Sequence, residues 1–213
     1  LMQANLNWGG KEVPSELHNK VSDLTPLARL ENLQRLVVTG NDVRNVTPLA
    51  NLTEMIQLYI GYNEELSDIS PLANLVNMQL LVIDATKVRD ISVVENFPNF
   101  SLLHASSGID SLEPLRNANK LTSLRTSKSN FPDLEPLRNK PLLSHLHVPN
   151  SNVSDISAIA DSVNLTSLYL YSNPLNESTL DVISNFRQLD SLHLTNTGIS
   201  NIVFLSSLTS LTR

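Results

Sequence analysis

The chain has 213 residues, of which 15 are basic and 21 acidic, giving a formal net charge of −6. A nucleic-acid-binding protein normally carries a basic stripe, which this acidic chain lacks, and no run of about 18 apolar residues could span a membrane. Cysteine is absent, so disulfides and thiolate zinc sites are excluded.

The first 20 residues lack the pattern that fills the rest of the chain, and they contain Trp8, the only tryptophan. We expect residues 1–20 to form an irregular end piece or a worn repeat, with Trp8 covering the first layer of the core. Residues 21–213 are expected to form one solenoid of about eight repeats.

One sequence pattern recurs about every 22 residues from residue 33 to the end of the chain. It reads L-x-x-L-x-L-x-x-[N/T/S]-x-L, as in LQRLVVTGNDV at 33–43 and LTSLYLYSNPL at 165–175. Self-similarity at a fixed period of this length is the signature of a repeat architecture. The repeats begin at Leu33, Met55, Met78, Phe100, Leu121, Leu143, Leu165, Leu189 and Leu211.

Each repeat predicts the same three elements in the same order. The L-x-L alternation predicts a short strand with leucines inward and their neighbours outward. A polar corner follows, at Asn41, Asn63, Thr86, Ser129, Ser151, Asn173 and Thr197. There an Asn can bond buried backbone groups, which Ser and Thr do less fully. Segments such as SDISPLANL at 67–75 then predict a turn. We expect Asp68 to accept hydrogen bonds from free N–H groups of this turn and Pro71 to stand at the first position of a short helix.

A single repeat cannot stand alone, because its buried leucines do not offset the entropy of ordering about 22 residues. The repeats must therefore stack. Strands lie about 4.8 Å apart and the turns opposite are bulkier, so we predict a curved α/β repeat solenoid. Its parallel sheet should line the concave face, with short 3-10 or helical turns on the convex face.

Several places depart from this pattern. The turns at 97–98, 107–108 and 140–141 break the consensus, and NPLNESTLDVISNF at 173–186 is long enough for a true helical turn. The final LTSLTR stops inside a new strand, so we expect the protein to continue, or to be capped, beyond Arg213.

The outward positions between the second and third leucines define a candidate binding surface. In chain order they are Val37, Tyr59, Val82, His104, Arg125, His147, Tyr169 and His193. Tyr, His and Arg on an exposed surface are typical of protein interfaces, although Tyr also suits any strand surface through β-propensity. The predicted protein-binding residues are Tyr59, Tyr62, His104, Arg125, His145, His147, Tyr169, Tyr171 and His193, with Tyr62 and Tyr171 at the rim.

The histidines suggest two further hypotheses. Their charge would rise between about pH 7 and pH 5, which would make the surface cationic. A metal site is not expected, because His104, His147 and His193 would lie two strands apart in turn, about 10 Å. No phosphate loop, nucleophile elbow or zincin motif occurs, so we predict no catalytic residue and no cofactor.

The 22-residue length together with the phrase SDISPLANL resembles the internalin type of leucine-rich repeat, found in Gram-positive bacteria. The resemblance implies a secreted or cell-surface adhesion protein that holds a protein partner, such as a host receptor, on its concave face without turnover. We expect a monomer. Two other functions fit the repeats: a cytoplasmic scaffold or regulatory subunit, and the substrate-selecting part of a larger enzyme.

Overall fold

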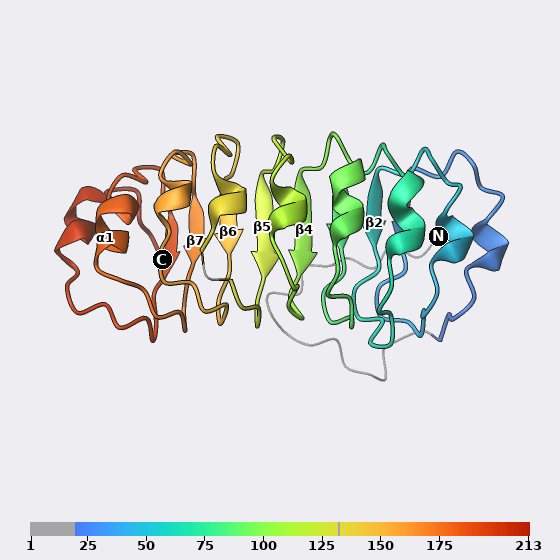
Figure 1. Cartoon of the computed structure of the whole chain (residues 1–213), viewed down its shortest axis with the longest axis horizontal. Coiled ribbons are helices and arrows are strands. Elements are labelled where there is room, and N and C mark those ends of the chain that lie inside the picture. Colours follow the sequence, from blue (N-terminus) through green and yellow to red (C-terminus); the bar gives the residue numbers. More distant parts are fainter. Residues whose placement is uncertain (1–19, 132) are drawn as a thin grey trace.

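A computed structural model describes residues 20–131 and 133–213. The expected end piece at 1–20, including Trp8, therefore lies almost wholly outside the described residues and stays a prediction. From residue 20 onward the chain winds into coils that lie side by side, from the N-terminal coil to the C-terminal one (Figure 1). None of the described helices is long and apolar enough to cross a membrane.

The inner side of the coils is one open parallel sheet. Its strands pair in sequence order from β1 to β8, so each repeat hydrogen-bonds only to the repeats before and after it. The strands are β1 (Arg35–Val37), β2 (Gln57–Tyr59), β3 (Leu80–Val82), β4 (Leu102–Ala105), β5 (Ser123–Thr126), β6 (His145–His147), β7 (Ser167–Tyr169) and β8 (Ser191–His193).

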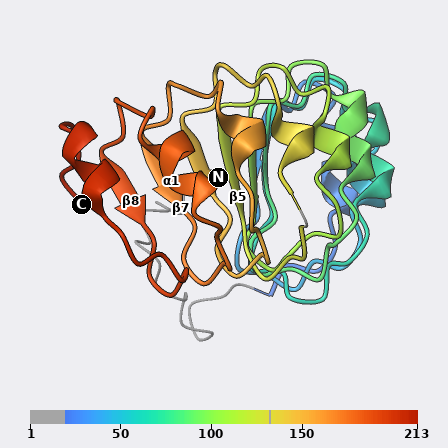
Figure 2. The ribbon, with the colours of Figure 1, turned by 60° about the vertical axis from the view of Figure 1, so that its left-hand side comes forward.

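Short helical turns line the opposite side of the molecule and form its convex face (Figures 1 and 2). They are η2 (Thr25–Leu27), η3 (Thr47–Leu49), η4 (Ser70–Asn74), η5 (Ser92–Asn96), η6 (Glu113–Leu115), η7 (Glu135–Leu137), η8 (Ser157–Ile159), α1 (Ser178–Ile183) and η9 (Val203–Ser207). The predicted curved solenoid is confirmed, and so is the true helical turn expected within 173–186, which is α1.

The residues before each turn cap it as predicted, but the position of the proline differs from the prediction. The Asp68 carboxylate accepts the N–H of Ser70 at 2.8 Å, and the six equivalent residues do the same two positions ahead. Pro71 is the second residue of its turn rather than the first. The reason is that the first residue, Ser70, needs its N–H for this bond, whereas the next position has no such requirement.

The core is a continuous seam of aliphatic side chains between the sheet and the turns. Inward strand residues such as Leu58, Leu103 and Leu146 have no exposed surface, and neither do repeat starts such as Met55 and Phe100. Each layer is sealed by the layers on both sides, which is why the repeats depend on one another for stability.

The polar corner is also as predicted at the seven positions named from the sequence, whereas Gly108 occupies the corner after β4. Asn63 is fully buried, donates to the carbonyls of Ile60 and Val38, and accepts the N–H of Val43 at 2.9 Å. Thr86 stands at the same position in the next repeat but makes bonds only within its own repeat, to Ile83 and Val88. The corner is made sharp by a residue of positive φ just before it, such as Tyr62 at 55°.

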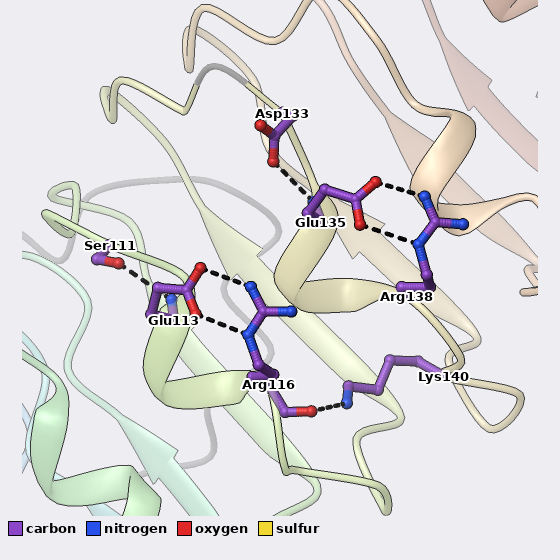
Figure 3. A network of polar contacts seen from close by, with 7 residues as sticks. All are labelled: Ser111, Glu113, Arg116, Asp133, Glu135, Arg138 and Lys140. Atoms are coloured by element: carbon purple, nitrogen blue, oxygen red, sulfur yellow. Dashed lines mark hydrogen bonds and ion pairs between the residues drawn. The ribbon is translucent and has the colours of Figure 1, made fainter.

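The convex face carries ion pairs and one buried lysine (Figure 3). Glu113 and Arg116 form a bidentate pair across η6, and Glu135 pairs with Arg138 in the same way across η7. Lys140, at one of the breaks in the consensus, is 1% exposed and donates from Nζ to the carbonyl of Arg116 at 2.6 Å. This bond ties one convex turn to the next.

Candidate binding surface

The sheet register aligns the predicted outward positions into one continuous line, which we call the concave row. Its neighbours are paired directly across the strands, for example His104 with Arg125, Arg125 with His147, and Tyr169 with His193. The whole row is Val37, Tyr59, Val82, His104, Arg125, His147, Tyr169 and His193. Eight strands about 4.8 Å apart make the row roughly 35 Å long.

A second outward line runs beside the first, two residues earlier on each strand. This second row is Arg35, Gln57, Leu80, Leu102, Ser123, His145, Ser167 and Ser191. Of these only His145, which is exposed, was among the residues predicted from the sequence. The same L-x-L alternation identifies the others, because residues two apart on a strand share a face.

The C-terminal half of the surface is an aromatic cluster. His147 and Tyr169 stack with ring centroids 3.9 Å apart and an interplanar angle of 2°. His193 meets Tyr169 edge-on at 5.2 Å and Tyr171 at 5.4 Å. Ring pairs of this kind contribute about 0.5–1.5 kcal/mol each beyond their burial, so the four side chains hold one another in place.

Hydroxyl groups of the second row fix the rings from the neighbouring strand. His147 Nε2 and Ser167 Oγ share a hydrogen bond of 2.7 Å, and the Tyr169 hydroxyl lies 3.1 Å from Ser191 Oγ. Because each Ser belongs to the strand after that of its ring, the bonds run diagonally across β6, β7 and β8. The rings are thus held in one arrangement by contacts within the chain.

The hypothesis that all four histidines become charged between pH 7 and pH 5 is wrong for two of them. Burial lowers the pKa of His104 to about 4, with the charge of Arg125 as the next cause. Burial likewise lowers the pKa of His147 to about 3, again with Arg125 as the next cause. Both rings therefore stay neutral across that range. The sequence placed them outward but did not reveal how deeply their neighbours cover them.

The centre and the N-terminal half of the surface have a different character. Arg125 is exposed in the middle of the concave row. Next to the central histidines, Leu80, Val82 and Leu102 form an apolar area that is only partly accessible. At the far end, the Arg35 guanidinium lies 5.2 Å from the centre of the Tyr59 ring, a cation–π contact that orients both side chains.

Two predicted residues lie at the margin of this surface. Tyr171 reaches the aromatic cluster through its contact with His193. Tyr62 does not join that cluster, because it belongs to the corner after β2, with β3, β4 and β5 standing between β2 and the cluster. Across residues 20–131 and 133–213 no three His, Asp or Glu side chains are grouped so that they could hold a metal ion.

Comparisons with known proteins agree with the fold. No family model matches the sequence, and no curated protein matches it. The solved structure of an internalin (InlF) from Listeria monocytogenes is 27% identical with a TM-score of 0.67, and the match covers 91% of this chain and 70% of that one. Internalin C2 (InlC2) of the same species is 33% identical with a TM-score of 0.64, covering 69% of this chain and 65% of that one.

More distant structures share the fold alone. The Arabidopsis receptor kinase HAESA, solved with the peptide hormone IDA and the co-receptor SERK1, is 19% identical with a TM-score of 0.79. Its match covers 90% of this chain but only 35% of the receptor. This chain thus spans about two thirds of the two internalins and about a third of the plant receptor.

Proposed function

We propose that this chain, a leucine-rich repeat protein of the 22-residue type that resembles the internalins, is a non-catalytic module that binds a protein partner on its concave face. The observation that carries the proposal is the continuous concave row, in which a Tyr, His or Arg stands on six of the eight strands and Val37 and Val82 stand on the other two.

The physical support for this function is preorganisation. The rings are fixed by stacking and by serine hydroxyls, and the strands that carry them are held by hydrogen bonds on both sides. A partner therefore meets a surface that is already in its binding conformation, and little free energy is spent on ordering it. Binding of this kind needs no reacting group.

We place the protein in the secreted or cell-surface class, as a bacterial adhesion or receptor-binding protein whose partner is a host receptor and which acts as a monomer. The likeness to two internalins, at 27% and 33% identity, supports this placement. It can be tested in the source organism: an antibody against the repeats should stain intact cells or detect the protein in the medium. Detection only after lysis would contradict the surface class and would favour the cytoplasmic scaffold.

The binding surface itself can be tested with matched variants. The chain would be immobilised and exposed to extracts of surface-labelled host cells, and the captured protein identified. Its affinity would then be measured for Tyr169→Ala on the concave face and for Arg116→Ala on the convex face. We expect Tyr169→Ala to weaken binding about tenfold or more and Arg116→Ala to leave it unchanged. Equal affinity of both variants and the unchanged chain would refute concave binding.

A further inference from the structure

The charge on the concave face differs in sign from that of the chain. The whole chain has 21 acidic and 15 basic residues, yet neither the concave row nor the second row contains a single Asp or Glu. These two rows carry Arg35 and Arg125 together with four histidines. The face proposed to meet a partner is therefore neutral to basic on an otherwise acidic molecule.

The acidic residues closest to these rows already have partners. Asp84 follows Ile83 just after the end of β3, and its carboxylate accepts the N–H of Ser106 at 2.8 Å. Asp190 precedes β8, accepts the hydroxyl of Thr212, and lies 3.4 Å from the Arg213 guanidinium. The charge of Asp84 acts on His104, whose pKa it raises, but neither Asp84 nor Asp190 forms an ion pair with Arg125.

Arg125 stands in the middle of the concave row without a carboxylate. None of the ion pairs in the described part of the chain includes Arg125, whereas Arg89, Arg116 and Arg138 each pair with an Asp or Glu. Its strand neighbours in the row are His104 and His147, so no anion faces it from either side. An exposed guanidinium presents a planar fork of N–H donors that matches the two oxygens of a carboxylate.

We propose that the partner presents an acidic protein segment along the concave row, with an Asp or Glu carboxylate of that segment bound to the Arg125 guanidinium. This inference rests on the proposed function. Apolar side chains on one side of that carboxylate contact Leu80, Val82 and Leu102, and those on the other side contact the aromatic cluster. Charge thus sets the register of the segment, and the flanking apolar contacts supply most of the buried area.

The surroundings of Arg125 favour a carboxylate over a phosphate. Phosphopeptide sites are built from clusters of arginines, whereas here a single arginine lies between uncharged rings and an apolar area. Nucleic acid is disfavoured further, since the chain as a whole carries a net charge of −6.

The probe for this inference is a library of random 12-residue peptides displayed on phage and selected on the immobilised chain. Selected peptides would be synthesised, and their affinities measured for the chain, for Arg125→Gln and for the convex control Arg138→Gln. We expect the peptides to share an Asp or Glu beside apolar residues. Arg125→Gln should weaken them about tenfold or more, and Arg138→Gln should have no effect.

A double-mutant cycle makes the assignment specific. Changing the shared Asp or Glu of the peptide to Asn or Gln should cost as much as Arg125→Gln, and the two changes together should cost little more than either alone. Equal thermal midpoints for the two protein variants would show that both are folded.

The other outcomes separate this inference from the proposed function. Peptides that lose affinity with Tyr169→Ala but not with Arg125→Gln would overturn the acidic segment while leaving concave binding intact. Peptides that bind Arg125→Gln as tightly as the original chain would overturn it. Peptides that bind both Arg125→Gln and Tyr169→Ala as tightly as the original chain would count against concave binding as well.

Discussion

Asn63 connects two repeats through one side chain. It has no exposed surface, its amide group donates to carbonyls of its own repeat and of the previous one, and its carbonyl oxygen accepts the N–H of Val43. Asn63→Ala would leave these buried groups without partners, which costs about 1–3 kcal/mol for each unsatisfied group. We expect the free energy of unfolding, measured with urea, to fall by about 3 kcal/mol or more. The exposed Asn51→Ala serves as the control, and equal losses in both variants would contradict the role of the corner.

His147 makes stability depend on pH. Its pKa in the folded chain is about 3, below the ordinary value of about 6.5, because burial and the charges of Arg125, His145, His104 and His193 disfavour its cation. The unfolded chain therefore binds a proton first as the pH falls. The contribution of His147 to the free energy of unfolding is therefore fully present above about pH 6.5, and it is lost as the pH falls towards 3.

The expected loss from His147 between pH 7 and pH 5 is at most about 2 kcal/mol. In His147→Phe the ring stack can persist without this titration, so its unfolding free energy should change less over that interval. Tyr169→Phe keeps the ring stacked on His147 and leaves every histidine in place, so it should keep the slope of the original chain. Identical slopes for His147→Phe and the original chain would remove His147 as the cause.

Gly108 stands at a corner where two repeats come into close contact. Gly108 occupies the corner position filled elsewhere by Asn, Thr or Ser, and its φ is +93°. A Cβ there would lie 2.8 Å from the carbonyl oxygen of Lys128, in the next repeat. Gly108→Ala therefore adds a clash between repeats to the backbone strain of a positive φ.

Gly198→Ala is the matched control, since Gly198 also has a positive φ of 80° but no atom within 4 Å of the added Cβ. We expect Gly198→Ala to cost about 1 kcal/mol and Gly108→Ala about 1–3 kcal/mol more, measured by denaturant unfolding. If the two variants lose the same stability, backbone strain alone accounts for both.

For the strands and turns, the sequence predicts where each element lies better than it predicts the side-chain contacts between repeats. The period of about 22 residues and the L-x-L alternation predict the strands and the outward residues, because both depend only on local spacing. The low pKa of His147 and the burial of Lys140 depend instead on side chains more than 20 residues away. Spacing within one repeat carries no information about those contacts, and the hydroxyl bonds to the rings were missed for the same reason.

The whole molecule is a one-dimensional stack. Within residues 20–131 and 133–213, the strands and turns of each repeat contact only those of adjacent repeats, so no contact between these elements skips a repeat. Leu124 on β5 is fully buried in the middle of the stack, and Leu124→Ala should cost about 2–5 kcal/mol. Hydrogen exchange should accelerate most in β4, β5 and β6. Uniform acceleration from β1 to β8 would indicate a single cooperative unit instead.

The face that meets the partner is tested most directly by photo-crosslinking. A photoreactive amino acid would replace His145, exposed on the second row, or Val76, which stands just after the convex turn η4 and is 47% exposed. Each variant would be irradiated with the captured partner, and the covalent products resolved by mass. We expect a crosslink from position 145 and none from position 76. A crosslink from position 76 alone would place the partner on the convex face and contradict the account.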